Sequence, residues 1–118
     1  MNLKPRIGHI EMFVNNVDKA TRFYIEILDF ELETDQGNVK WIKKDHLEIL
    51  LRPGKPKINS RYEDSNIGFV LYTEDLNETR QNLLAKGLEF KGTVDSEKCL
   101  TFTDLDGHWW QLVDPHDH

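Results

Sequence analysis

A strand followed by a helix occurs twice in this chain, and this repeat restricts the folds open to it more than any other feature. Residues 7–14 form an apolar-rich run with the composition of a half-buried strand. Moving the sequence along by 59 positions (68 minus 9) places His9 over Gly68 and Tyr24 over Leu83. We therefore expect two copies of one supersecondary unit.

Each copy continues into a helix. In the first copy the apolar residues recur at three- and four-residue spacing, which is the pattern of a helix with one buried face: Ala20, Phe23, Tyr24, Ile27 and Leu28. We expect Asp18 to be the N-cap of this helix and Asp29 to end it. The second helix is expected over residues 75–86, ending at Gly87, because glycine suits a left-handed C-cap.

Three short strands are expected after each helix. They fall at residues 30–34, 39–43 and 46–52 in the first half, and at 88–94, 99–103 and 109–113 in the second. Residues 53–66 hold two of the four prolines and form the expected linker. The sequence therefore predicts one domain over 1–118, built from βαβββ units at 5–52 and 67–115. Its class is α+β, with both helices on one side of a mixed sheet that curves around a cleft.

Composition limits the partners and the compartment. The chain has 31% charged and 38% hydrophobic residues, no apolar run near the roughly 20 residues of a membrane helix, and no apolar signal region. Cys99 is its single cysteine, so an internal disulfide is excluded and we expect a cytoplasmic protein. The net charge of -6 disfavours nucleic acid and leaves open a cationic ligand. No membrane partner is expected.

Two stretches resemble the vicinal oxygen chelate superfamily, which includes glyoxalase I, bleomycin-resistance proteins, fosfomycin-resistance proteins and extradiol dioxygenases. The first is GHIEMFV at residues 8–14, with Asn16, Val17, Phe23 and Tyr24. The second is FTDLDG at residues 102–107, with Gln111, Leu112 and Pro115; Leu105 stands where the family usually has proline. This resemblance implies the glyoxalase and bleomycin-resistance fold of paired βαβββ units around a cleft.

Metal-using members of that superfamily place four ligands on cleft-facing strand positions. The resemblance puts these positions at His9, Glu48, Gly68 and Gln111. Glycine has no donor atom and an amide oxygen is a weak, uncharged ligand, so two good ligands remain where a catalytic divalent site typically has three. We therefore expect no cofactor; a divalent Zn, Ni, Mn or Fe ion held by His9 and Glu48 is the alternative. Glu11 shares their face and could add a third ligand, although adjacent positions of one strand seldom converge on one ion.

Strand side chains alternate between faces, so the family positions also identify the other cleft-facing residues. The expected ligand-binding set is His9, Glu11, Phe13, Glu48, Gly68, Tyr72, Trp109 and Gln111. The opposite parity, expected to pack as core, gives Ile10, Met12, Phe69, Leu71, Trp110 and Leu112. Cys99 and Thr101 are assigned to the face away from the cleft. Structural roles are the alternative for single residues: His9 as a hydrogen-bonded strand histidine, Glu48 beside His46 as a solvated edge, and Trp109 as core.

These residues lead to two hypotheses of function. The first is a small-molecule-binding protein of the bleomycin or antibiotic-resistance type, without a catalytic metal, which binds a planar or cationic compound in an acidic, aromatic cleft. The second is a metal-dependent lyase resembling glyoxalase I, in which Glu48 would move a proton. We also expect a homodimer, with the units paired within one chain or exchanged between two. The missing side chain at Gly68 predicts a void beside His9 and Gln111 that serves as ligand space.

Overall fold

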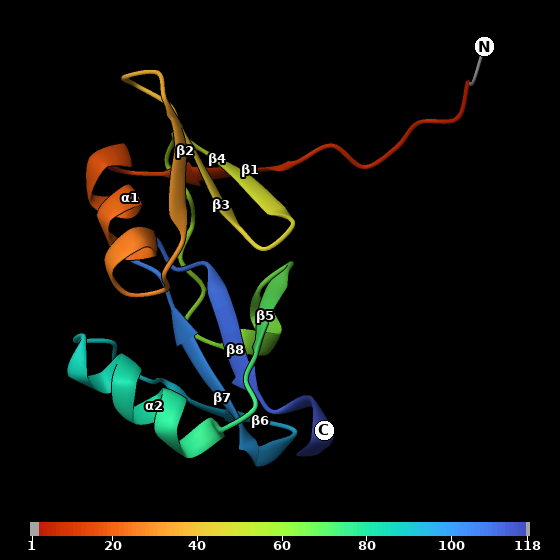
Figure 1. Ribbon diagram of the computed structural model, residues 1–118, viewed down its shortest axis with the longest axis vertical. Coiled ribbons are helices and arrows are strands. Elements are labelled where there is room, and N and C mark those ends of the chain that lie inside the picture. Colours follow the sequence, from red (N-terminus) through yellow and green to blue (C-terminus); the bar gives the residue numbers. More distant parts are fainter. Residues whose placement is uncertain (1–2, 118) are drawn as a thin grey trace.

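The computed structural model describes residues 3–117, which form two βαβββ units (Figure 1). The first unit contains β1 (Ile10–Val14), α1 (Val17–Glu26), β2 (Glu31–Asp35), β3 (Lys40–Lys44) and β4 (Leu47–Pro53). The second contains β5 (Gly68–Tyr72), α2 (Leu76–Ala85), β6 (Gly92–Val94), β7 (Ser96–Thr103) and β8 (Trp109–Val113). Two short 3-10 helices, η1 (Tyr62–Asp64) and η2 (Pro115–Asp117), lie before β5 and after β8.

Within residues 3–117 the strands form two four-stranded sheets, ordered β1-β4-β3-β2 and β5-β8-β7-β6. The first and last strands of each unit pair in parallel, and the remaining pairs are antiparallel. Figure 1 shows one unit above the other, with both helices on the same side. The predicted α+β class and the repeated unit are confirmed, and hydrogen bonding divides the strands between two mixed sheets rather than joining them in one.

The helix ends follow from local side-chain chemistry. The Asn16 side chain accepts a hydrogen bond from the Lys19 backbone N–H at 3.0 Å, so Asn16 is the N-cap of α1 and the prediction of Asp18 is wrong. Asp18 lies in the first turn, where a carboxylate complements the helix dipole. Asp75 caps α2 by accepting from the Glu78 N–H at 3.0 Å. Gly87 follows α2 with φ +97°, as predicted for a left-handed C-cap.

The predicted strand over 88–94 is shorter in the structure, where β6 begins only at Gly92. The Leu88 N–H donates to the Leu83 carbonyl at 3.0 Å, so this residue takes part in the C-terminal cap that follows α2. Its side chain is buried, which explains why it extended the apolar pattern of a strand.

The two units share one hydrophobic core. Alternation along β1 buries Met12 and Val14 and leaves Phe13 between them half exposed, whereas all five residues of β8 are buried, Trp110 among them. The predicted core face is confirmed: Met12, Trp110 and Leu112 are buried, and Ile10, Phe69 and Leu71 pack against them. Tyr24 from α1 contacts Trp110 from β8 with ring centroids 6.0 Å apart, so the core crosses the boundary between units.

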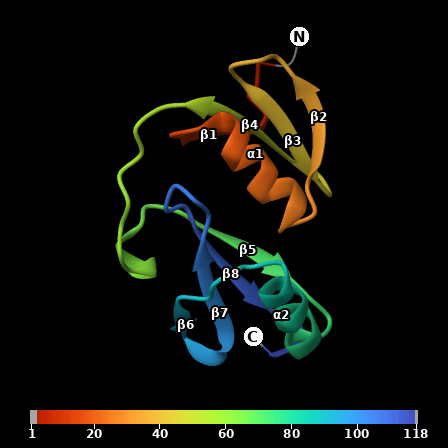
Figure 2. The ribbon, with the colours of Figure 1, turned by 90° about the vertical axis from the view of Figure 1, so that its left-hand side faces the viewer.

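The linker runs from β4 to β5 along the outside of the two units (Figure 2). Its η1 helix brings Tyr62 onto the second sheet, and Ile58 lies against Gly107 in the turn between β7 and β8. No helix within residues 3–117 is long and apolar enough to cross a membrane.

Candidate functional site

The open face of the first sheet carries a charge-paired cluster around Glu11. Arg52 Nη1 donates to Glu11 Oε1 at 2.5 Å, and His9 Nε2 lies 3.0 Å from Glu11 Oε2. The hydrogen bonds from Arg52 and then from His9 lower the pKa of the Glu11 carboxyl. The Arg52 guanidinium also lies over the Phe13 ring, 5.8 Å from its centroid. Because Glu11 is already paired, it does not favour a cationic ligand on this face.

His9 and Glu48 are neighbours across β1 and β4. The parallel register pairs Ile10 with Ile49, so the residues immediately before them share the open face. The His9 ring makes an edge contact with Trp41, with ring centroids 4.5 Å apart. The first sheet thus brings together four predicted site residues: His9, Glu11, Phe13 and Glu48.

The corresponding face of the second sheet is covered by the linker. Gln111 Nε2 donates to the Tyr62 hydroxyl at 2.9 Å, and Trp109 Nε1 donates to the Asn59 carbonyl at 2.9 Å. The Tyr62 and Trp109 rings meet edge to face, with centroids 6.0 Å apart. This cover leaves Gln111 Oε1 buried without a hydrogen-bond partner among the described residues.

The predicted void at Gly68 is absent, so this prediction is wrong. A Cβ added at Gly68 would lie 2.5 Å from the Tyr62 hydroxyl oxygen, which means that Tyr62 fills the space that a side chain at residue 68 would enter. The remaining predicted residue of this sheet, Tyr72, lies at the far end of β5 and is 73% exposed.

The assignment of Cys99 and Thr101 to the opposite face is also wrong. β7 and β8 pair Cys99 with Val113 and Thr101 with Gln111, and paired residues of antiparallel strands point to the same face. Both side chains are buried. The buried Cys99 offers no accessible nucleophile.

A cavity of about 240 Å³ lies where β1, the linker and the starts of β5 and β8 meet. Its walls are both aromatic and polar, and they include Glu11, Phe13, Lys57, Asn59, His108 and Trp109. Three predicted ligand-binding residues, Glu11, Phe13 and Trp109, line this cavity. The other five predicted residues do not line it: His9, Glu48, Gly68, Tyr72 and Gln111.

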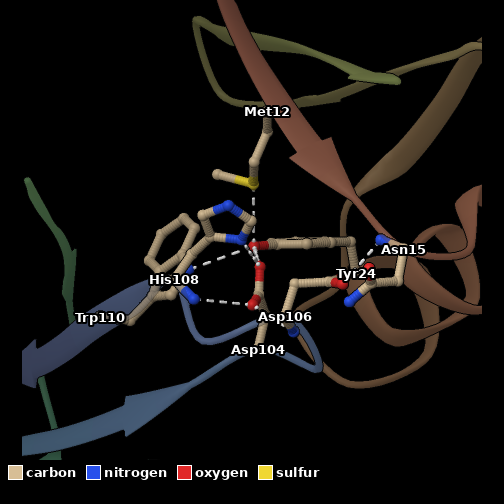
Figure 3. Close-up of polar contacts among 7 residues, drawn as sticks. All are labelled: Met12, Asn15, Tyr24, Asp104, Asp106, His108 and Trp110. Atoms are coloured by element: carbon tan, nitrogen blue, oxygen red, sulfur yellow. Dashed lines mark hydrogen bonds and ion pairs between the residues drawn. The ribbon is translucent and has the colours of Figure 1, made fainter. Parts of the chain in front are cut away.

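A buried polar network borders the cavity and joins the two units (Figure 3). The Tyr24 hydroxyl donates to Asp104 Oδ2 at 2.5 Å and accepts from Trp110 Nε1 at 3.2 Å. His108 Nδ1 lies 2.7 Å from the same Asp104 oxygen. Burial, followed by the negative charge and hydrogen bonding of Asp104, raises the pKa of Tyr24 well above its usual range. Tyr24 therefore stays protonated and acts as a donor.

The turn between β7 and β8, which contains Asp104 and Asp106, also contacts the first unit just after the end of β1. The Asn15 backbone N–H donates to Asp106 Oδ1 at 2.8 Å, across 91 positions of sequence. Asp104 Oδ1 meanwhile accepts from the backbone N–H groups of Asp106 and His108, each at 2.9 Å. The aspartates of the predicted FTDLDG turn thus organise the turn and attach it to the first unit.

Comparison with known proteins agrees with this architecture. The sequence model of the Glyoxalase/Bleomycin resistance protein/Dioxygenase superfamily matches residues 6–112. The chain belongs to this superfamily. Metallothiol transferase FosB from Staphylococcus haemolyticus is 27% identical over 115 residues, covering 90% of this chain and 81% of that protein. FosB from Staphylococcus epidermidis matches at the same identity and coverage.

Solved structures of the superfamily share the fold. The fosfomycin resistance protein FosX from Listeria monocytogenes has a TM-score of 0.74 at 23% identity, covering 95% of this chain and 92% of that one. A FosX mutant solved with Mn(II) and 1S,2S-dihydroxypropylphosphonic acid has a TM-score of 0.73 at 23% identity, covering 94% and 90%. A metal is therefore present in at least one structure of this fold.

The residues at the superfamily's metal positions do not form such a site within one chain. His9 and Glu48 lie on the first sheet, whereas Gln111 lies on the second and is bonded to Tyr62. No group of three or more His, Cys, Asp or Glu side chains among residues 3–117 is arranged to hold a metal ion. Glu11, the proposed third ligand, is bound to Arg52 instead.

The sequence did not predict the polar residues that the linker and the turn between β7 and β8 bring to the cavity, namely Lys57, Asn59, Ser65, Asn66 and His108. The four linker residues lie in a segment with no periodicity, so no pattern could place them. His108 directly follows Gly107, and its position after a tight turn was the available signal.

Proposed function

We propose that this superfamily member is a small-molecule-binding protein of the antibiotic-resistance type, which binds its ligand in the cavity between the units without a catalytic metal. The observation that carries the proposal is the cavity itself, with Phe13 and Trp109 as aromatic walls and polar groups beside them. Binding pockets for small molecules combine these features. The volume of about 240 Å³ lies just below their usual range of roughly 300–1,000 Å³, so a small, planar ligand fits best.

The ligand atoms available at the superfamily's metal positions support a function without a catalytic metal. Gly68 supplies no ligand, and Tyr62 takes the space in which a longer side chain would reach the site. The resistance role is supported by likeness to FosX, which is named for fosfomycin resistance.

The binding test uses purified protein with its metal content measured first. We expect less than stoichiometric Zn, Ni, Mn and Fe, and thermal stabilisation by a subset of planar compounds from an antibiotic panel that includes fosfomycin and bleomycin. Phe13→Ala should weaken that binding about tenfold, because it removes an aromatic wall. Leu32→Ala is the matched control, since Leu32 is similarly exposed on β2 but lies outside the cavity. Equal effects of the two variants would contradict the assignment of the ligand to this cavity.

The resistance role is tested separately in a susceptible bacterium expressing the protein. The compound that binds should require a higher concentration to inhibit growth, and Phe13→Ala should abolish the difference. If a compound binds but its inhibitory concentration does not rise, the binding proposal stands and the resistance role is contradicted.

A metal-dependent lyase resembling glyoxalase I is the second candidate. It is favoured by the adjacency of His9 and Glu48 across the β1–β4 register. Tightly held stoichiometric metal that is lost in His9→Ala would favour this candidate and contradict the metal-free proposal.

We also propose that the protein is a homodimer. β1 and β5 are edge strands, and they expose apolar side chains: Phe13 on β1, with Val70 and Tyr72 on β5. Such edges are usually covered or paired in soluble proteins. Sedimentation at micromolar concentration should give twice the 13.9 kDa of one chain. A species at 13.9 kDa alone would contradict the dimer.

A further inference from the structure

His108 is held in one orientation by a buried carboxylate. Its Nδ1 lies 2.7 Å from Asp104 Oδ2, and its backbone N–H donates to Asp104 Oδ1 at 2.9 Å. Asp104 is only 6% exposed and is fixed in turn by the Tyr24 hydroxyl. The imidazole therefore cannot rotate freely without breaking a buried contact.

The second ring nitrogen of His108 is available to a ligand. Nε2 has no hydrogen-bond partner within residues 3–117, and the side chain is 21% exposed and lines the cavity. Figure 3 shows this nitrogen on the side of the ring away from Asp104. A fixed imidazole with one free nitrogen facing a cavity is suited to donate a hydrogen bond to a bound group.

The unpaired charges around the cavity are positive, although the whole chain carries a net charge of -6. Lys57 lines the cavity and forms no ion pair with any residue in 3–117. The one carboxylate among the lining residues, Glu11, is already paired with Arg52 and His9. The charge left unpaired at the cavity is therefore positive, whereas the net charge of the whole chain is negative.

The neighbours of His108 favour its charged form. Burial lowers the pKa of His108, but the hydrogen bond to Asp104 and the charges of Asp104 and Asp106 raise it by more. Tyr24 from α1 is neutral, and Lys57 and the paired Glu11 are the charged groups that the linker and β1 bring to the cavity. These neighbours thus favour the imidazolium form, which can meet an anion in the cavity.

We propose that the cavity binds a small aromatic carboxylate, with its carboxylate on His108 Nε2 and Lys57 and its ring along Phe13 and Trp109. Asn59, Ser65 and Asn66 also line the cavity. The inference rests on the proposed small-molecule function and adds the chemical class of the ligand. Charge-assisted hydrogen bonds to a carboxylate are among the stronger polar contacts available to a protein.

The test compares benzoate with its neutral analogue benzamide, using tryptophan fluorescence and the NMR shift of the His108 ring. Benzoate should bind at least about tenfold more tightly than benzamide, and its affinity should fall as pH rises through the pKa of His108. Lys57→Met should weaken benzoate binding about tenfold, while Lys55→Met on the same linker, outside the cavity, should leave it unchanged. His108→Gln should also weaken it, with His116→Gln as the matched control.

The outcomes separate this inference from the proposed function. If benzamide binds as tightly as benzoate and Phe13→Ala weakens both, the cavity is a small-molecule site and the carboxylate inference is wrong. If benzoate binds equally to the wild type and to Lys57→Met, the inference is also wrong. Because Lys57 lies on the exposed linker, this result does not depend on whether His108→Gln folds.

Discussion

Tyr62 and Gly68 occupy one space: the Tyr62 hydroxyl oxygen lies 2.5 Å from the point where a Cβ at residue 68 would stand. Real Cβ atoms do not approach other atoms so closely, so a side chain at residue 68 and the present position of Tyr62 exclude each other. The linker thereby replaces, from six residues earlier in the chain, the side chain that β5 lacks.

Gly68→Ala should therefore destabilise the protein by about 1–2 kcal/mol, in the lower part of the range for overpacking, because the Tyr62 hydroxyl is the movable end of a side chain. The same substitution in a Tyr62→Ala background should cost much less, since the clashing atoms are gone. Urea denaturation of the four proteins measures this coupling. Equal costs in both backgrounds would show that Tyr62 is not what limits residue 68.

Tyr24→Phe should lower the free energy of unfolding by about 2–3 kcal/mol. The substitution removes one of the two side-chain partners of Asp104 Oδ2, which keeps His108, and it removes the Tyr24 acceptor of the buried Trp110 indole N–H. Denaturant unfolding measures the loss. The control is Tyr72→Phe, whose hydroxyl is on a 73% exposed residue and should matter little. A loss no greater than that of the control would contradict the role assigned to the network.

Stability should depend on the protonation of His108. Its pKa in the folded protein is raised above 6.5, so the folded state binds the proton more tightly than the unfolded chain. The resulting stabilisation is fully present below pH 6.5 and disappears as pH rises through the raised pKa. Across this window, stability should fall less steeply with pH in His108→Gln than in wild type. His116→Gln should keep the wild-type slope, and a slope lost in both variants would contradict the assignment.

Strand patterns predicted much of the fold because alternation is a local property. Met12 was placed in the core by parity and is buried between the exposed Glu11 and Phe13, whereas β8 is buried along its whole length. The error at Cys99 arose because the face of β7 relative to β8 depends on the turn between them. The register of Thr103 with Trp109 decides that face, and it is set by contacts of the intervening turn rather than by either strand.

The residues of the candidate site were harder to predict from the sequence than the fold was. Glu11 and Phe13 lie on β1 and His9 immediately precedes it, so their common side followed from the pleat. Tyr62 and Lys57 belong to the linker, and their positions on the second sheet and at the cavity depend on long-range packing. A segment without regular periodicity gives no indication of which surface it will cover.

Within the described part of the chain, the Gln111 amide has one satisfied and one unsatisfied polar atom. Its Nε2 donates to Tyr62, but Oε1 is buried without a partner among residues 3–117. Gln111→Leu loses a hydrogen bond of about 1 kcal/mol and removes an unpaired acceptor that costs about 1–3 kcal/mol. The free energy of unfolding should therefore stay constant or rise by up to about 2 kcal/mol. Urea denaturation provides the measurement, with Thr101→Val on the paired position of β7 as the control for burial on this face. A clear destabilisation by Gln111→Leu alone would mean that Oε1 has a partner in solution, such as water, a ligand or a second copy of the chain.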